Sequence, residues 1–303
     1  MDRRTFIKSS IGASAAIGSL LNLGKYDNLF SITPTAYDLV AIKGGEPDLM
    51  FDKGIEALGG IRAFVKKGQT VVVKPNIGWD VPPERAANTN PKLVSRIVKH
   101  CIDAGAKDVY VVDHTCDEWQ RAYKNSGIEK AVKDVGGKIV PGNSESYYQS
   151  VTIADGKTLK NTKEHEIILS SNVFINVPIL KSHSGTTLTI AMKNLMGNVW
   201  DRRYWHRTDL HQCIADFATY RKPDLNIVDA YWVMKANGPR GVSIEDVVTM
   251  KAQLISTDMV AVDAAAAKLF GLNPDDIGYI RYAAEMKVGI KDLDKLNIKR
   301  ITV

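Results

Sequence analysis

The segment from residue 177 to residue 200 collects side chains that could bind an anion or move a proton. Lys181 and His183 stand near its start, and Lys193 and Asn194 follow on the same short stretch. Ammonium groups form strong hydrogen bonds with anionic oxygen atoms, and an imidazole can carry protons or bind a metal near neutral pH. This combination favours a site for an anionic ligand.

The chain here is expected to leave a buried strand, turn, and enter a helix at residues 187–196 that stops at Gly197. His183 would then precede a helix N-terminus, where free N–H groups favour an anion. The side chain of Lys193 would tilt back toward that same end. We therefore predict that Lys181, His183 and Lys193 converge as catalytic residues. The alternative is two solvated lysines and a histidine bonded to a carbonyl.

Three histidines are candidate ligands for a divalent metal, namely His114, His206 and His211. Zinc, nickel and iron favour imidazole combined with carboxylate, which a residue such as Asp113 could supply. His206 is expected in a loop before a helix capped by Thr208, and His211 in the first turn of that helix. No HxH or HExxH spacing accompanies them, so histidines satisfied at the surface or in the core remain the alternative.

Polar residues follow several of the expected strands. Lys74 and Asn76 follow one strand, and Asp229 ends another. Because the carboxyl ends of parallel strands meet at one edge of a sheet, these residues are expected near the lysine-rich segment. Residues 237–241 (NGPRG) permit a tight loop with exposed N–H groups, in which Arg240 could clamp a carboxylate or phosphate. The alternative for this loop is a plain connecting turn.

The elements that would position these residues alternate along the chain. Amphipathic helical patterns at residues 91–104, 209–220, 258–270 and 274–286 lie between apolar, β-branched runs. The expected strands are residues 37–42, 70–74, 108–112, 138–140, 173–177, 225–229, 252–256 and 299–303. This alternation predicts an α/β fold, a three-layer α/β/α sandwich with a mostly parallel sheet. A small subdomain insertion between residues 115 and 170 is left open.

Composition argues against two classes of function. The 303 residues are 45% hydrophobic and 24% charged, with a formal net charge of +6. The lysines are scattered and form no basic stripe with aromatics, so no nucleic-acid partner is expected. Cys101, Cys116 and Cys213 form no CxxC pair, which makes an iron–sulfur cluster unexpected and leaves a single disulfide open.

The first residues resemble a twin-arginine export signal. Arg3 and Arg4 stand side by side, followed by a Phe, a Lys and a short apolar stretch. We predict an export signal at residues 1–30, a single α/β domain at 31–303, the twin-arginine translocase as a transient partner and a periplasmic location. That stretch is too short and too weakly apolar for a comfortable membrane span. Cleavage near residues 25–36 and retention as an anchor both remain open.

Several short motifs together resemble the domain-of-unknown-function family 362. They are KPN at 74–76, KSH at 181–183, KNLMG at 193–197, His206, PDLNIVDA at 223–230, NGPRG at 237–241 and STDMVAVDA at 256–264. The similarity extends from about residue 38 to residue 290 and implies a shared site, but the family has no settled activity. Many relatives carry an appended ferredoxin module, whose cysteines this chain lacks.

The resemblance and the strand-end pattern together predict the residues that bind the ligand. They are Lys74, Asn76, Asn194, Asp229, Gly238 and Arg240. The first hypothesis is an exported enzyme that acts on an anionic small molecule, with a metal or organic cofactor as an option. The alternative is a periplasmic ligand- or cofactor-binding protein without turnover. A third idea is a fold-level analogy to lactate racemase, which tethers a nickel-pincer cofactor to a lysine.

Overall fold

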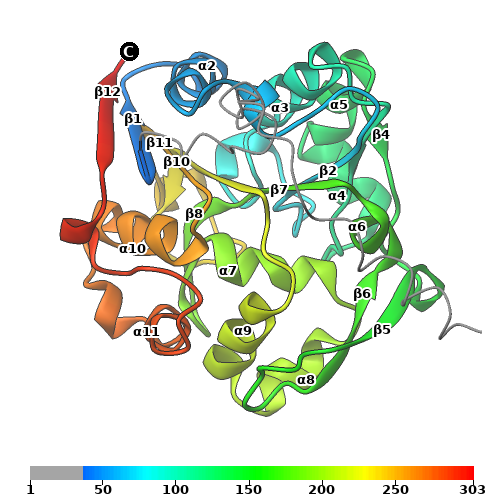
Figure 1. The fold of residues 1–303 in the computed structure, drawn as a ribbon, viewed down its shortest axis with the longest axis vertical. Coiled ribbons are helices and arrows are strands. Elements are labelled where there is room, and N and C mark those ends of the chain that lie inside the picture. Colours follow the sequence, from blue (N-terminus) through cyan, green and yellow to red (C-terminus); the bar gives the residue numbers. More distant parts are fainter. Residues whose placement is uncertain (1–36) are drawn as a thin grey trace, which may run out of the picture. The chain divides into compact units, whose positions relative to one another are not determined.

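A ten-stranded sheet forms the centre of the protein, whose computed structural model describes residues 37–303 (Figure 1). The strand order is β12-β1-β11-β10-β7-β2-β3-β4, with β8 paired to β10 and β9 paired to β8. The strands are β1 (Leu39–Lys43), β2 (Thr70–Pro75), β3 (Asp108–Val111), β4 (Lys138–Ile139), β7 (Val173–Val177), β8 (Ile179–His183), β9 (Thr187–Thr189), β10 (Leu225–Met234), β11 (Val247–Ser256) and β12 (Ile298–Thr302).

Most neighbouring strands of this sheet run parallel. The parallel pairs include β2 with β3, β2 with β7 and β10 with β7. Strand β11 is antiparallel to both of its neighbours, β1 and β10. The central strands are buried on both faces, as every residue of β7 is. This burial explains why their sequences are mostly apolar.

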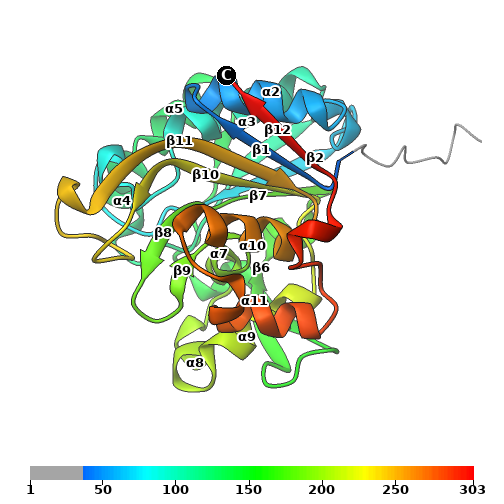
Figure 2. The ribbon, with the colours of Figure 1, turned by 90° about the vertical axis from the view of Figure 1, so that its left-hand side faces the viewer.

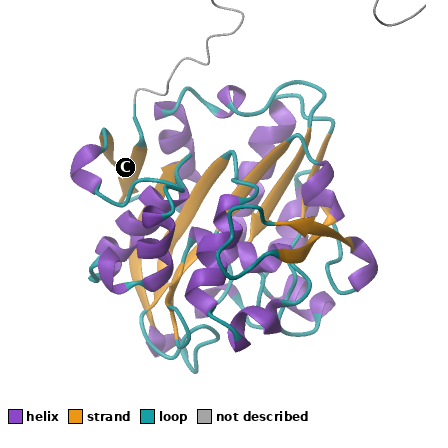
Figure 3. Cartoon of the chain, turned by 60° about the horizontal axis from the view of Figure 1, so that its bottom comes forward, coloured by secondary structure: helices purple, strands orange, loops and turns teal. Residues whose placement is uncertain are grey.

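Helices cover both faces of the sheet (Figures 2 and 3). On one face lie α2 (Pro47–Ala57), α3 (Pro91–Asp103), α4 (Trp119–Asn125) and α5 (Ile128–Asp134). On the other lie α7 (Ala191–Asn194), α8 (Arg202–Arg207), α9 (Leu210–Thr219), α10 (Met259–Phe270) and α11 (Gly278–Glu285). Each face of the sheet has its own hydrophobic core, and alternate strand residues face opposite cores. Val71 belongs to the core on the α2–α5 side, and Val72 belongs to the core on the α7–α11 side. The predicted α/β/α sandwich is confirmed.

Side-chain caps define where several helices begin. Asn90 accepts a hydrogen bond from the N–H of Lys92 at the start of α3, and Asp258 caps α10. The prediction for α9 was wrong by one residue, because Asp209 and not Thr208 accepts the capping bond. His206 lies in the short helix α8 and not in a loop.

The prediction of one helix over residues 187–196 was wrong. Strands β8 and β9 form a hairpin in which His183 pairs with Thr187 and Lys181 with Thr189. The helix α7 covers only Ala191–Asn194, and a 3₁₀ helix at Leu195–Asn198 extends it. The β-branched threonines before it pack more readily in an extended chain than in a helix.

The region between residues 115 and 170 contains a second, two-stranded sheet. Strands β5 (Tyr148–Thr152) and β6 (Asn161–His165) pair antiparallel, and α6 (Glu166–Ser170) follows directly. Contacts nevertheless group the described residues into one compact unit. Within residues 37–303, no helix is long and apolar enough to cross a membrane. The predicted export signal lies outside the described residues.

Short 3₁₀ helices occupy several connections. They are Ile61–Ala63, Pro83–Arg85, Glu145–Tyr147, Ile244–Asp246, Pro274–Asp276 and Leu293–Lys295.

Candidate functional site

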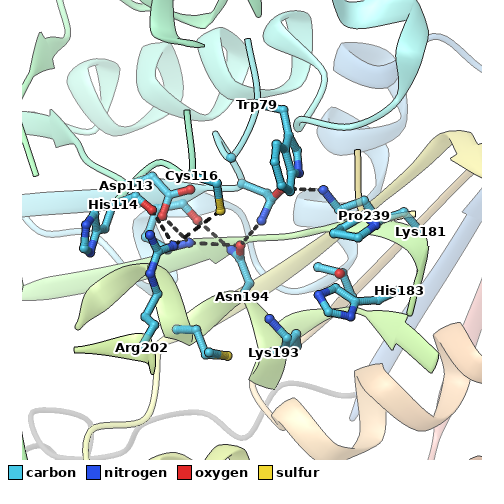
Figure 4. A pocket seen from close by; sticks show the side chains of 16 residues that line it. Trp79, Asp113, His114, Cys116, Lys181, His183, Lys193, Asn194, Arg202 and Pro239 are labelled. Atoms are coloured by element: carbon cyan, nitrogen blue, oxygen red, sulfur yellow. Dashed lines mark hydrogen bonds and ion pairs between the residues drawn. The ribbon is translucent and has the colours of Figure 1, made fainter. Parts of the chain in front are cut away.

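A polar pocket of about 60 Å³ lies where β2, β3 and β8 end and α7 begins (Figure 4). The predicted residues that line it are Lys74, Asn76, Lys181, His183, Lys193, Asn194 and His114. They come from segments far apart in the sequence, and the carboxyl edge of the sheet brings them together. The pocket is thus the place where the predicted site residues converge.

Lys74 forms a buried ion pair at the base of this pocket. The side chain is 0% exposed, and its Nζ lies 2.9 Å from Oδ1 of Asp113. It also donates to Oδ1 of Asn194 at 2.9 Å. Burial lowers the pKa of Lys74, while the charge of Asp113 opposes that shift. Asp113 in turn accepts from the N–H of Ile77 at 2.6 Å. The positive charge of Lys74 and the negative charge of Asp113 therefore cancel, and the pair adds no net charge to the pocket.

A chain of asparagine amides connects the pocket to the interior of the sheet. Asn76 donates to Asn194 at 2.9 Å, and Asn194 donates to Asn176 at 2.9 Å. Asn176 donates to Asn226 at 3.0 Å on β10. Buried amides are held in one orientation when each has a partner. Asn194 is therefore a positioning residue that holds Asn76 and Lys74, and not a free ligand contact.

Lys181 is buried and committed to oxygen acceptors. Its Nζ donates to Oδ1 of Asn76 at 2.9 Å and to the carbonyl of Ala87. Burial lowers the pKa of Lys181 to about 7, and the positive charge of Lys193 contributes to the lowering. The amine consequently changes its charge within the physiological pH range.

Lys193 is a half-buried cation without a fixed partner. Within residues 37–303, no side chain or carbonyl forms a hydrogen bond or ion pair with its amine. Burial lowers the pKa of Lys193 to about 8, and the charges of Arg202 and Lys74 add to this effect. An anion that enters the pocket would stabilise the positive charge of this desolvated amine.

His183 lies beside Lys193 in the pocket (Figure 4). Its Nδ1 accepts from the N–H of Gly185 at 3.0 Å, so the proton of the neutral ring is on Nε2. Burial lowers the pKa of His183 to about 3, assisted by the charges of Lys193 and Lys181. The predicted proton carrier is therefore arranged as a hydrogen-bond donor at neutral pH.

Three further residues of the pocket escaped prediction as site residues. Arg202 donates to the carbonyls of His114 at 2.8 Å and Thr115 at 2.9 Å. Cys116 presents an exposed thiol to the pocket. Thr189 is 3% exposed, and its hydroxyl has no hydrogen-bond partner among the described residues. The position of Cys116 after β3 is a signal that the strand-end rule could have used, whereas nothing local distinguishes Arg202.

Three predicted ligand contacts lie outside the pocket lining. Asp229 is 2% exposed and accepts from the N–H groups of Asn90 at 2.7 Å and Tyr231 at 3.1 Å. Burial raises the pKa of Asp229 to about 6. A Cβ on Gly238 would lie 1.8 Å from the carbonyl oxygen of Ser182. These contacts give both residues a structural role, Asp229 at the start of α3 and Gly238 against β8.

Arg240 does not line the pocket. It is exposed, lies 3.6 Å from the carboxylate of Asp117, and stacks its guanidinium over Trp79 at 5.7 Å. The neighbouring Pro239 reaches the pocket lining. The anion clamp predicted for this loop is thus directed at a carboxylate of the chain itself.

The structure does not bring the three predicted metal-binding histidines together. His114 donates from Nδ1 to the carbonyl of Val199 at 2.9 Å, and burial lowers its pKa to about 4. His206 is exposed on α8, and His211 accepts from the N–H of Tyr279 at 3.1 Å. Across the described part of the chain, no three His, Cys, Asp or Glu side chains are grouped to hold a metal ion.

A larger cavity of about 580 Å³ adjoins the pocket. Both are lined by His114, Cys116 and Arg202, so these residues mark the boundary between the two. Trp200 and Arg203 belong to the lining of the outer cavity. A ligand that enters the inner pocket can therefore extend into a wider space.

Solved structures with a similar arrangement have low sequence identity. The lactate racemase apoprotein of Thermoanaerobacterium thermosaccharolyticum matches 79% of this chain with a TM-score of 0.45 and 9% identity. A protein from Thermotoga maritima matches 80% with a TM-score of 0.45 and 8% identity. The chain spans 58% and 60% of these two proteins, respectively.

Sequence comparison identifies a relative and a family. The chain is 26% identical over 244 residues to the thylakoid-associated protein sll1697 of Synechocystis, covering 78% of this chain and 73% of that protein. A family model described as "Domain of unknown function (DUF362)" matches residues 71–268. This range contains every residue that lines the polar pocket. The chain therefore belongs to the DUF362 family.

Proposed function

We propose that this protein binds a small anionic molecule in the pocket and acts on it through Lys193. The observation that carries the proposal is the amine of Lys193, which has no hydrogen-bond or ion-pair partner among residues 37–303 and lies beside two further cations. Lys181 and Arg202 add positive charge, whereas Asp113, the carboxylate of the lining, is neutralised by Lys74. A partly enclosed pocket with surplus positive charge attracts an anion.

Two features favour an enzyme over a passive carrier. The pKa values of Lys181 and Lys193 are lowered by burial to about 7 and about 8, so both amines can exchange protons near neutral pH. Groups tuned in this way cluster at catalytic sites. The buried amide chain and the Lys74–Asp113 pair hold the surrounding backbone rigid, as catalysis requires. A protein that binds the anion without turnover is the second candidate.

Replacing Lys193 by alanine is expected to weaken anion binding about tenfold or more, because a charge-assisted hydrogen bond contributes roughly 1.5–3 kcal/mol. Calorimetric titration with inorganic phosphate, glycolate and malonate would measure the dissociation constants. The matched control is Lys124→Ala, which removes an exposed lysine outside the pocket. Equal affinities of the Lys193→Ala variant and the parent protein for every anion would contradict the proposal.

Anion affinity is expected to fall as pH rises through the range of 7 to 8. Below that range Lys181 and Lys193 are protonated and attract the anion; above it they lose that charge, since burial lowers their pKa values to about 7 and about 8. Bound anion favours the charged amines and so moves the midpoint upward. Titrations across this range, with an anion of constant charge such as glycolate, would show the decline. An affinity that rises with pH would exclude the assignment.

We also propose that the protein reaches the periplasm by the twin-arginine route. The support is the paired Arg3 and Arg4 before a short apolar stretch. In the Arg3→Lys/Arg4→Lys variant, the full-length precursor is expected to stay in the cytoplasmic fraction. An unchanged amount in the periplasmic fraction would contradict this route.

A further inference from the structure

The three lysines of the pocket differ in what their amines contact. Lys74 is held by Asp113 and Asn194, and Lys181 by Asn76 and the carbonyl of Ala87. The amine of Lys193 has no such contact within the described residues. Lys193 is also the most exposed of the three lysines, since Lys74 and Lys181 are 0% and 1% exposed. Its lone pair is therefore available once the proton leaves.

We propose that Lys193 forms an imine with the carbonyl carbon of a small oxo acid bound in this pocket. The inference rests on the proposed anion binding and assigns the substrate class. The surplus cations require a carboxylate or phosphate on the ligand, and an uncommitted amine reacts with a carbonyl group. A molecule that carries an acidic group and a carbonyl group within a few bonds can contact the cations and the Lys193 amine at the same time.

The step is balanced without any further reactant. The lone pair of the neutral Lys193 amine adds to the carbonyl carbon, and the π electrons move to the oxygen atom to give a carbinolamine. The carbon–oxygen bond then breaks, and the oxygen leaves as water with both protons of the amine. The products are one carbon–nitrogen double bond and one water molecule, with no change in oxidation state.

The environment favours the neutral amine that this step needs. Burial and the charges of Arg202 and Lys74 lower the pKa of Lys193 to about 8, while Cys116 and Asp113 oppose the shift. A solvated lysine has a pKa of about 10.4, so a larger fraction of Lys193 is neutral at physiological pH. Desolvation of this kind activates lysines as nucleophiles.

The neighbouring groups suit the two ends of an oxo acid. Arg202 and Lys181 carry the positive charge for the carboxylate. His183 lines the pocket with its proton on Nε2, where it can donate to the carbonyl oxygen. The hydroxyl of Thr189 is buried and unpaired among the residues described, so it also has a hydrogen bond to offer. The adjoining cavity leaves room for a ligand longer than the inner pocket.

Trapping by reduction tests this chemistry. The full chain is incubated with pyruvate or glyoxylate, reduced with sodium borohydride, and weighed by intact mass spectrometry. The expected result is one adduct per chain, with the mass of the oxo acid less one oxygen atom. Peptide mapping should locate it on the peptide that contains Lys193. Glycolate and lactate carry a hydroxyl group in place of the aldehyde or ketone group and should give no adduct.

Two substitutions at Lys193 separate the imine from general effects. Lys193→Ala removes the amine, and Lys193→Arg keeps the positive charge but has no amine that can form the imine. Both are expected to abolish the adduct, whereas Lys124→Ala, at an exposed lysine, should form it normally. Near-ultraviolet circular dichroism of each variant establishes that it is folded.

The outcomes distinguish this inference from the proposed function. A parent protein that binds glycolate in calorimetry but yields no reduced adduct retains the anion site and excludes the imine. An adduct that maps to Lys181, or that persists in Lys193→Arg, overturns the assignment to Lys193. A parent protein that neither binds glycolate nor forms an adduct removes both proposals.

Discussion

Replacing Gly197 by alanine is expected to lower the free energy of unfolding by about 3 kcal/mol and to abolish anion binding. An added Cβ would lie 1.8 Å from Oδ1 of Asp113 and 2.5 Å from Nζ of Lys74. One of these two buried groups must therefore move, and the ion pair between them must separate. Urea-induced unfolding and calorimetric titration with glycolate would measure the two effects.

Gly78 provides a matched control for that substitution. It also lines the pocket, but a Cβ there would meet nothing closer than Oδ1 of Asn76 at 3.9 Å and Sγ of Cys116 at 4.0 Å. Neither glycine has a positive φ, so backbone strain does not enter the comparison. Gly78→Ala should leave the free energy of unfolding within about 0.5 kcal/mol of the parent value. A loss in Gly197→Ala no larger than this would show that the pair tolerates the intrusion.

Replacing Lys74 by methionine is expected to reduce the free energy of unfolding by about 3–5 kcal/mol. The substitution leaves the carboxylate of Asp113 buried without its counter-charge and deprives Asn194 of a donor. Removing one partner of a buried pair is costly because the remaining charge stays desolvated. The matched control is Lys130→Met, which breaks an exposed pair with Asp134 at 2.6 Å; exposed pairs contribute about 1 kcal/mol or less.

A double variant identifies the cause of this loss. Lys74→Met with Asp113→Asn removes both charges and keeps a side-chain oxygen for the N–H of Ile77, which Asp113 holds at 2.6 Å. The double variant should be more stable than the sum of the single substitutions predicts, with a coupling of about 2 kcal/mol. Additive losses, or a Lys74→Met variant as stable as Lys130→Met, would contradict the role assigned to the pair.

Much of the fold and part of the site follow from local patterns. Buried strands such as β7 have mostly apolar, β-branched sequences, and this local pattern predicts them without reference to their neighbours. Once the strands alternate with helices, their carboxyl ends must share an edge. That rule was sufficient to bring Lys74, Asn76 and Lys181 to one pocket before any contact was known.

Contacts between distant segments decided the rest. The hairpin of β8 and β9 replaced an expected helix because pairing between strands depends on partners that a local periodicity does not contain. Gly197, expected as a helix stop, is required by the close approach of Lys74 on β2 and of Asp113, which follows β3. Arg202 is held at the pocket by hydrogen bonds to carbonyls that follow β3, a strand far from it in the sequence.

Sequence by itself therefore determined the alternation of elements, the edge that carries the site and most of the cations at that edge. Tertiary structure decided which of those cations are held by partners and which one has none within the described part of the chain. The physical reason is that the charge state and freedom of Lys193 depend on burial and on the partners of its neighbours. Those quantities arise only when segments far apart in the chain have packed together.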